Sequence, residues 1–580
     1  MMPLLIFFFI FSSASCNEEN WWKFTEIYEV YISSFKDSNG DGVGDLKGIT
    51  SKLDHFVDLQ IDSIWITPFF ESPKNDNGYD ISNYTAVDPV FGTLADFEEL
   101  SKEAKKRGIK ILIDFVINHS SDEHIWFQKS IEKIKPYDDY YVWKDPKGYD
   151  KNNNPIPPNN WLSWFDGIAW EWNTKRKQYY LHHFGKKQPD LNLKNEKLIN
   201  DLKDVLVFWF DRGVSGLRFD AAAYYIEDAE FRDESLKKLD SKSKLEFGFG
   251  RDAYTNKYTK NLPESYELIH KFRVFIDNFN KIKGGNKRII VIEDYADLKS
   301  TLAYYGTEDH PVAHYPFNFE LARASDFFTS ASLHQLITTW LESVPKFGVP
   351  AWNAENHDRS RIGSRFSEEY ARLINILMML LPGVPSIYYG QEICMINGVV
   401  RPDQEKDYVL LPGTTRTRDL ARTPMQWDST LNSGFTSEVK TWLPVQPSFW
   451  RLNVEIGKNN RNNCLNIFKD LSRLRKTRTC KYGTFNSFQL STWLYVFTRN
   501  LKEHDTYIVI MNLGTDYQMA NLQGRIPNLK TFLKVLITTE NSGYNKGDII
   551  KVKSKYPPVF VMRPLSAIVF LNGLSSKVRG

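Results

Sequence analysis

At 580 residues the chain is longer than one hydrophobic core usually supports, which predicts one large domain and at least one smaller one. Hydrophobic residues make up 42% of the chain and charged residues 25%, a balance typical of folded globular proteins. The formal net charge is only +3 and no concentrated basic stretch occurs, so nucleic acid is not an expected partner.

The first 16 residues are typical of a secretory signal peptide. An apolar run from Leu4 to Phe11 is too short to span a bilayer, and small residues follow it. We expect cleavage after Ser15 or Cys16, and therefore a secreted protein. No later stretch approaches the roughly 20 apolar residues that a membrane helix needs, so no stable membrane insertion is expected.

Cysteine is rare for a secreted chain. Of the four cysteines, Cys16 leaves with the signal peptide if cleavage follows it. The remaining Cys394, Cys464 and Cys480 then allow at most one disulfide and leave one free thiol. No C-x-x-C pair occurs, which argues against a cysteine metal site.

Two positions match the N-glycosylation acceptor pattern, Asn83-Tyr84-Thr85 and Asn118-His119-Ser120. The first is a candidate for modification in a secreted protein. We expect the second to be buried and therefore unmodified.

Short apolar runs alternate with amphipathic ones over most of the chain. Residues 94–108, for example, have helical spacing, a basic last turn and a terminal Gly108. Eight runs are predicted to be buried strands: 27–35, 61–70, 109–116, 213–219, 288–293, 314–319, 347–353 and 384–389. Eight such strands alternating with helices indicate a (β/α)8 TIM barrel, which carries its functional residues at the C-terminal ends of the strands.

Two further regions are predicted around this barrel. Residues 119–198, between the third and fourth strands, are rich in Trp, Tyr, Asn and Pro, and we expect an insertion domain with a functional role. After about Lys476 short alternating segments are separated by turn residues, which indicates a C-terminal antiparallel β-sandwich domain over 477–580. The barrel is therefore expected in two parts, 17–118 and 199–476.

Four of the predicted strands end in acidic residues, often with a histidine nearby. In G-L-R-F-D-A-A (216–222), Arg218 and Asp220 are two residues apart and share one face of the strand. A guanidinium there would hold the carboxylate ionised and oriented, as a carboxylate nucleophile requires. A buried Arg-x-Asp alone is more often a structural ion pair. The similar tips at 111–119, 288–295 and 351–358 favour a catalytic site instead.

The sequence resembles the α-amylase superfamily of glycoside hydrolases, and within it the α-glucosidase and oligo-1,6-glucosidase branch that includes insect maltases. The resemblance covers about Trp21 to Asn572. It rests on seven motifs in the family's order: D-F-V-I-N-H (114–119), Q-P-D-L-N (188–192), G-L-R-F-D (216–220), I-E-D-Y (292–295), E-N-H-D (355–358), G-V-P-S-I-Y-Y-G-Q-E (383–392) and R-T-P-M-Q-W-D (422–428).

The resemblance implies three catalytic acids. Asp220 is similar to the family's nucleophile, Glu293 to its acid/base, and Asp358 to a third carboxylate that stabilises the distorted, oxocarbenium-like sugar. Retaining hydrolysis needs one ionised and one protonated carboxyl about 5–5.5 Å apart. Repulsion from the two neighbouring carboxylates should raise the pKa of Glu293 and keep it protonated.

The resemblance also implies a set of glucose-binding residues: Asp76, Tyr79, His119, Phe184, Arg218, His357 and Arg422. The histidines would bind sugar hydroxyls, Tyr79 would stack on the terminal glucose, and Asp76 would bind its far hydroxyls. We expect Arg422 to pair with Asp76 and to close the pocket, as in an exo-acting enzyme that takes one terminal glucose. For Phe184, packing within the insertion domain is an equally weighted alternative to a place in the pocket wall.

The segment D-S-N-G-D-G-V-G-D (37–45) places oxygen ligands at alternate positions, from the side chains of Asp37, Asn39, Asp41 and Asp45 and the carbonyl of Val43. Acidic residues at this spacing, with glycines for tight turns, suit a hard cation such as Ca²⁺. The segment is not a full EF-hand, because Gly48 stands where the final Glu would be. The resemblance implies a structural Ca²⁺ or Mg²⁺ here, and an Asx-rich turn without a metal is the alternative.

The resemblance implies a small oligosaccharide as substrate and a monomer or dimer as the oligomeric state. Alanines within 221–224 favour maltose-type α-1,4 and sucrose-type substrates over α-1,6 linkages, with water or a second sugar as acceptor. Ala222-Ala223-Tyr224, Asp294 and Ala354-Glu355 depart from the family pattern, which puts the linkage preference in doubt.

The leading expectation is a secreted α-glucosidase of the gut lumen or saliva. One alternative is a sucrose hydrolase or transglucosidase of the same branch, which the sequence does not separate from a maltase. The other is a non-catalytic relative such as the heavy subunits of amino-acid transporters, which carry a membrane helix ahead of the barrel and have lost catalytic acids. The three retained acids favour an enzyme.

Overall fold

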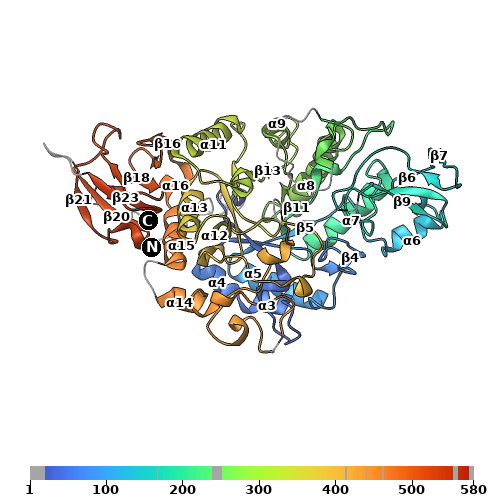
Figure 1. Cartoon of the computed structure of the whole chain (residues 1–580), viewed down its shortest axis with the longest axis horizontal. Coiled ribbons are helices and arrows are strands. Elements are labelled where there is room, and N and C mark those ends of the chain that lie inside the picture. Colours follow the sequence, from blue (N-terminus) through green and yellow to red (C-terminus); the bar gives the residue numbers. More distant parts are fainter. Residues whose placement is uncertain are drawn as a thin grey trace, which may run out of the picture.

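The structure is a computed structural model that describes residues 20–573, except 166, 238–250, 412–414, 439, 460–462 and 553–558, and except the side chain of Asp252. The predicted signal peptide, 1–16, lies outside the described residues. Figure 1 shows a central barrel with the insertion after its third strand on one side and the C-terminal sheet on the other.

Eight parallel strands form the barrel, and strands that follow each other in the chain are neighbours in it. In chain order they are β1 (Ile27–Val30), β2 (Ser63–Ile66), β5 (Lys110–Phe115), β11 (Val214–Phe219), β12 (Ile289–Ile292), β13 (Tyr315–Pro316), β14 (Ala351–Asn353) and β15 (Val384–Tyr388). The last strand, β15, pairs with β1. Between β13 and β14 the backbone N–H of Asn353 donates to the carbonyl of Asn318. The ring is thus closed, and the predicted (β/α)8 barrel is confirmed.

Several strands are shorter than the apolar runs that predict them. The 27–35 run is divided between β1 and the short helix α2 (Ile32–Phe35). The 61–70 run leaves the barrel after Ile66, because Pro68 has no N–H for a strand ladder. Its end, β3 (Phe70–Glu71), pairs with β4 (Asn83–Val87) instead. The loops beyond these strands are themselves buried, so hydrophobicity alone does not mark where a strand ends.

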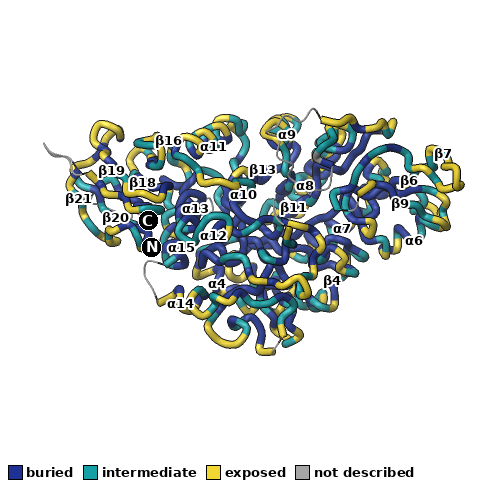
Figure 2. The backbone as a smooth tube through the Cα atoms, viewed as in Figure 1, coloured by how far each residue is buried: buried dark blue, intermediate teal, exposed yellow. Residues whose placement is uncertain are grey.

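Helices surround the barrel, and Figure 2 shows its deeply buried centre enclosed by half-exposed segments. In the predicted 94–108 helix, now α5 (Leu94–Lys106), Thr93 caps the N-terminus through a reciprocal pair of bonds with Asp96. Phe97, Leu100 and Ala104 form its buried face. The other principal helices are α3 (Leu46–Ser51), α4 (Leu53–Asp58), α7 (Glu196–Asp211), α8 (Pro263–Lys283), α9 (Leu298–Ala303), α11 (Ser330–Ser343), α13 (Glu368–Leu380) and α15 (Cys464–Arg475).

The insertion has secondary structure of its own. It contains helix α6 (Ile125–Ile131) and a three-stranded antiparallel sheet of β6 (Trp143–Lys144), β10 (Gln178–Leu181) and β9 (Trp170–Asn173). Trp161 and Trp170 pack with Leu181 in a separate small core. The aromatic composition that set this segment apart in the sequence therefore forms a local core. The boundaries predicted for the two barrel parts, the insertion domain and the C-terminal domain remain predictions.

The C-terminal domain is built on a six-stranded antiparallel sheet in the order β16-β17-β18-β23-β20-β21, with a two-stranded sheet of β19 and β22 beside it. Their bounds are β16 (Thr484–Gln489), β17 (Leu494–Asn500), β18 (Tyr507–Asn512), β19 (Gln518–Ala520), β20 (Phe532–Thr538), β21 (Ile549–Lys551), β22 (Phe560–Met562) and β23 (Ser566–Asn572). Along β17, Tyr495 and Phe497 join the barrel core, whereas Leu494 and Val496 join the core with β22. This alternation is the period-two pattern that predicted the domain.

One disulfide joins Cys394, in the segment after β15, to Cys464 at the start of α15. Cys480 is buried and has a free thiol. The prediction of one disulfide and one remaining thiol is confirmed for these three cysteines. Asn118 of the second glycosylation pattern is buried, as expected. Among the described residues, no helix combines the length and apolar character needed to cross a membrane.

Candidate active site

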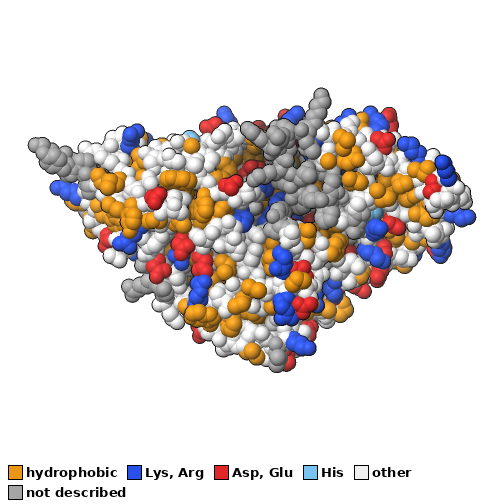
Figure 3. All heavy atoms as spheres, viewed as in Figure 1, with side chains coloured by type: hydrophobic (Ala, Val, Ile, Leu, Met, Phe, Trp, Pro, Cys, Tyr) orange, Lys and Arg blue, Asp and Glu red, His pale blue; other side chains and the backbone are white. Residues whose placement is uncertain are grey.

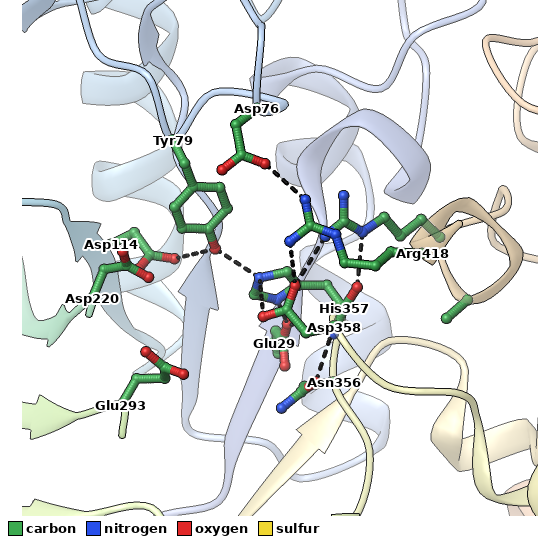
Figure 4. A network of polar contacts seen from close by, with 12 residues as sticks. Glu29, Asp76, Tyr79, Asp114, Asp220, Glu293, Asn356, His357, Asp358 and Arg418 are labelled. Atoms are coloured by element: carbon green, nitrogen blue, oxygen red, sulfur yellow. Dashed lines mark hydrogen bonds and ion pairs between the residues drawn. The ribbon is translucent and has the colours of Figure 1, made fainter. Parts of the chain in front are cut away.

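A cavity of about 460 Å³ lies at the C-terminal ends of the barrel strands. Its size suits a small ligand. The predicted residues that line it are Asp76, Tyr79, His119, Phe184, Asp220, Glu293, His357 and Asp358. Figure 4 shows Asp220 and Glu293 on one side of this space and His357 and Asp358 on the other. The two remaining predicted residues, Arg218 and Arg422, lie behind the lining and hold its acids.

Strand pairing brings Asp220 and Glu293 together. In the adjacent parallel strands β11 and β12, Phe219 lies beside Ile292, so the residues that follow both emerge at the same end. Ala221 then adopts a left-handed conformation, with φ of +51°. Its N–H donates to Oε2 of Glu293 at 3.2 Å. A non-glycine residue in this region is strained, and such strain is concentrated at functional sites.

Arg218 contacts three acids at the C-terminal ends of the strands. Its Nη1 donates to Asp114 at 2.6 Å and also to Asp220, and its Nη2 is 3.7 Å from Glu293. The indole N–H of Trp65 donates to Asp114 at 2.9 Å. The predicted Arg218–Asp220 pair is therefore formed, but it is shared with Asp114. Asp114 is the next-to-last residue of β5 and belongs to the motif at 114–119. Its position near the C-terminal end of a predicted strand was the signal that could have identified it.

Burial raises the pKa of Asp220 to about 7 and the pKa of Glu293 to about 8. Arg218 opposes both shifts, while repulsion between the carboxylates adds to them. Glu293 is farther from Arg218, and its pKa is the higher of the two. The predicted raised pKa of Glu293 is thus found. Arg218 does favour ionised Asp220, as expected, but burial outweighs this effect.

Asp358 lies on the opposite side of the cavity and has a different charge environment. It accepts hydrogen bonds from Nη1 of Arg418 at 2.9 Å and Nη2 of Arg422 at 3.0 Å. Burial works against its ionisation, but His357 and the two arginines outweigh burial and hold the pKa of Asp358 well below its ordinary value. Of the three predicted catalytic acids, Asp358 is therefore held ionised, while Asp220 and Glu293 have pKa values raised to near neutrality.

The partner predicted for Asp76 is wrong. Arg418, not Arg422, pairs with Asp76, at 2.7 Å. Arg422 instead bonds to Asp358 and, at 3.2 Å, to Asp407. The two arginines are four residues apart around the short helix η7 (Arg418–Ala421), so both reach the same group of acids. Arg422 belongs to a recognised motif and Arg418 does not, but their helical spacing was a signal that could have identified Arg418.

Aromatic and histidine side chains complete the wall. The rings of His119 and Phe184 lie 5.1 Å apart, and the ring of Tyr79 is stacked on His357 at 5.5 Å. Burial lowers the pKa of His119 to about 4, so its imidazole is neutral and can donate or accept a hydrogen bond. Nε2 of Gln188 donates to Asp76 at 3.0 Å and fixes that carboxyl. The position of Phe184 supports its predicted place in the pocket wall.

The loop over 37–45 is outside this cavity lining. Asp37 accepts N–H bonds from Gly40 and Gly42, and Asp45 accepts them from Ser38 and Gly48. Both carboxylates are buried, and neither forms an ion pair with another described residue. Within the described residues, no three His, Cys, Asp or Glu side chains are grouped as a metal site. The predicted ligand set includes two other oxygens, those of Asn39 and Val43, and it is chemically suited to a hard cation.

Arg418→Ala is expected to lower the free energy of unfolding by about 3–5 kcal/mol, because the buried carboxylates of Asp76 and Asp407 would lose their shared cation. Arg401→Ala, which breaks the exposed pair with Asp403, is a matched control and should change stability little. Urea denaturation followed by circular dichroism measures both. Equal, small effects of the two substitutions would contradict a structural role for Arg418.

Known proteins resemble this chain over most of its length. The model described as "Alpha amylase, catalytic domain" matches residues 29–483. The chain is 39% identical to Maltase 1 of Drosophila virilis, over 90% of this chain and 83% of that one. It is 40% identical to an alpha-glucosidase of Apis mellifera, over 86% of each. The solved structure of an alpha-glucosyl transfer enzyme aligns with a TM-score of 0.83 and 31% identity, over 95% of this chain and 99% of that one. The chain therefore belongs to the α-amylase family and is a glycoside hydrolase.

Proposed function

We propose that the protein is a secreted, exo-acting retaining α-glucosidase. It would remove the terminal glucose from maltose and short α-1,4-linked oligosaccharides, and also from sucrose. The observation that carries this proposal is the grouping of Asp220, Glu293 and Asp358, from three distant segments, around one cavity of about 460 Å³. Secretion rests on the N-terminal pattern over 1–16 alone.

The two acids with raised pKa suit a double-displacement reaction. Ionised Asp220 would attack the anomeric carbon, while protonated Glu293 donates its proton to the glycosidic oxygen and the bond to the leaving sugar breaks. Glu293, now ionised, would take a proton from water, and the resulting hydroxide equivalent would displace Asp220 from the glucosyl group. Asp358 remains ionised throughout and would stabilise positive charge on the sugar ring.

The cavity wall across from Asp220 and Glu293 supports the binding of one terminal glucose. Asp76 is held by both Arg418 and Gln188, so its carboxyl is fixed toward the cavity. Hydroxyls of a terminal sugar could bind to this acid, while Tyr79 and Phe184 offer ring surfaces to its apolar faces. A wall formed by a buried ion pair favours an end-acting enzyme over one that binds a long chain through an open cleft.

Transfer of glucose to a second sugar is the alternative that the cavity also supports. The covalent glucosyl group on Asp220 could be attacked by a sugar hydroxyl in place of water. Beyond Glu293 the cavity extends past Tyr224, Lys260 and Asp294, where an acceptor sugar would have room and polar partners. A non-catalytic role is less supported, because the three acids converge as the reaction requires.

Asp220→Asn is expected to keep the fold and to lower kcat for 4-nitrophenyl α-glucoside by more than about a thousandfold, because an amide is not a nucleophile. The matched control is Asp297→Asn, which changes an exposed acid of the same cavity. That variant should retain near-normal turnover. Substantial activity of Asp220→Asn would contradict the assignment of Asp220 as the nucleophile.

The pH dependence of kcat/KM should be bell-shaped and centred near neutrality. The active form has Asp220 ionised and Glu293 protonated, so activity falls below a pKa of about 7 as Asp220 gains a proton and above a pKa of about 8 as Glu293 loses one. The two apparent values belong to the coupled pair. Glu293→Gln should abolish the alkaline limb for α-glucosyl fluoride, whose leaving group needs no acid. A profile with both limbs below pH 5 would contradict these assignments.

We propose further that Asp37, Asn39, Asp41, Asp45 and the carbonyl of Val43 bind a structural Ca²⁺ or Mg²⁺. The supporting observation is that two of these carboxylates are buried and accept only N–H and O–H donors among the described residues. A bound cation would compensate their charge.

EDTA is therefore expected to lower the melting temperature of the wild-type protein, and excess Ca²⁺ should restore it. Differential scanning calorimetry with and without the chelator measures the effect. In Asp41→Ala, which removes an exposed ligand and leaves the buried acids in place, the chelator should have a smaller effect. An identical melting temperature of the wild type in EDTA and in Ca²⁺ would exclude a structural cation.

A further inference from the structure

Glu29 is a buried acid beside the cavity, and no sequence motif assigns it a role. It belongs to β1 and is fully buried. Its Oε1 lies 2.6 Å from Nδ1 of His357 and 3.4 Å from the backbone nitrogen of the same residue. Its Oε2 has no hydrogen-bond partner within the part of the chain that the structure describes. Figure 4 shows Glu29 on one side of the imidazole and Tyr79 on the other.

The surroundings of Glu29 are unfavourable for a carboxyl with only a structural purpose. Burial raises the pKa of Glu29 well above its ordinary value, and nearby Asp358 and Asp114 add to this effect. Arg218 opposes it, but that guanidinium bonds to Asp114 and Asp220. A buried polar atom without a hydrogen-bond partner costs roughly 1–3 kcal/mol. An apolar residue would avoid this cost, so the carboxyl must serve its one partner, His357.

The other nitrogen of that imidazole faces hydrogen-bond acceptors. Nε2 of His357 is 3.4 Å from Oδ2 of ionised Asp358 and 2.9 Å from the hydroxyl oxygen of Tyr79. The single proton of that hydroxyl is donated to Asp114, 3.2 Å away. Neither neighbour therefore has a proton for Nε2. With the Tyr79 hydroxyl donating to Asp114, Nε2 of His357 must carry the ring proton and act as the donor.

This requirement leaves two states for the pair. Protonated Glu29 can donate to Nδ1 of a neutral imidazole, or an imidazolium can donate from Nδ1 to ionised Glu29. Both states hold two protons between the two residues, and in both the Nε2 proton is retained. Burial lowers the pKa of His357 to about 3, which favours the neutral imidazole.

We propose that Glu29 is a positioning residue that holds Nδ1 of His357 and thereby keeps a proton on Nε2, from which His357 donates to a hydroxyl of the bound glucosyl group. Because His357 is assigned to glucose, this role rests on the proposed α-glucosidase function. The contact fixes both the direction of the ring and the position of its proton. Glu29 itself does not touch the sugar.

Two substitutions test the role of the carboxyl. The side-chain amide in Glu29→Gln can donate to Nδ1, so this variant should retain kcat/KM for 4-nitrophenyl α-glucoside within about fivefold. Glu29→Ala frees the ring to place its proton on Nδ1 and should lose roughly 10- to 100-fold, the range for a hydrogen bond with a charged group. Should Glu29→Ala fail to fold, Glu29→Met carries the same test with a side chain of similar size. Wild-type rates in Glu29→Ala or Glu29→Met would overturn the proposal.

Deoxy substrates separate positioning from a general structural effect. The wild type and Glu29→Ala are compared on the 2-deoxy, 3-deoxy and 6-deoxy analogues of the same glucoside. The 4-deoxy analogue is included as well, and the loss in Glu29→Ala should shrink to less than threefold on the one analogue that lacks the hydroxyl bound by His357. An equal loss on the parent glucoside and all four analogues would mean that Glu29 is only structural, and the proposal would be wrong.

Glu392 provides a matched control. It is also fully buried, its Oε1 lies 2.9 Å from Nε2 of His55, and its Oε2 has no hydrogen-bond partner among the described residues, but it does not line the cavity. Any loss in Glu392→Ala should be the same factor on every analogue. If the wild type hydrolyses none of the glucosides, the proposed function itself fails. If the wild type is active but Glu29→Ala behaves like Glu392→Ala, only the role of Glu29 fails.

Discussion

Charge compensation at the mouth of the barrel is the constraint on which the site depends. The acids gathered there are the buried Glu29, Asp76, Asp114 and Asp407 and the partly buried Asp220, Glu293 and Asp358. The arginines among them are Arg218, Arg418 and Arg422. The acids outnumber the arginines, so a low-dielectric site cannot hold all of them ionised. How the three guanidiniums are distributed decides which acids keep their protons.

The pKa directions follow that distribution. Asp358 and Asp407 each contact both Arg418 and Arg422, and the pKa of each is lowered despite burial. The acids that share one arginine, among them Asp220 and Glu293, have a raised pKa because burial prevails. Among the three predicted catalytic acids, one is thus held ionised opposite two with raised pKa values, a division that suits the proposed retaining hydrolysis. The outer face of the molecule in Figure 3 differs from this site, because Lys and Arg side chains are interspersed there with Asp and Glu side chains.

The barrel and most of the cavity could be predicted from the sequence because they depend on local signals. An apolar run that ends in an acid marks both a buried strand and its functional end, as with Asp220 and Glu293. Glu29 could not be found in this way. A single acid inside the run I-Y-E-V-Y has the pattern of any polar position in a strand. Its contact with His357 forms only because the closed barrel brings β1 close to the segment after β14. Arg418 was missed because it lies in a region without periodicity, where recognition depended on a motif that begins at Arg422.

One departure from the family pattern, Asp294, has a physical explanation in the same constraint. Asp294 would add an uncompensated buried acid beside Glu293, but Nζ of Lys260 lies 3.6 Å from it and Tyr304 donates to it at 3.1 Å. Nζ of Lys260 also donates to the carbonyl of Tyr295 at 3.0 Å. The unusual acid and its lysine therefore form one neutralised unit in the cavity wall. Both Asp294 and Lys260 line the cavity together with Glu293, so this departure changes the charges in the cavity wall without adding an uncompensated acid.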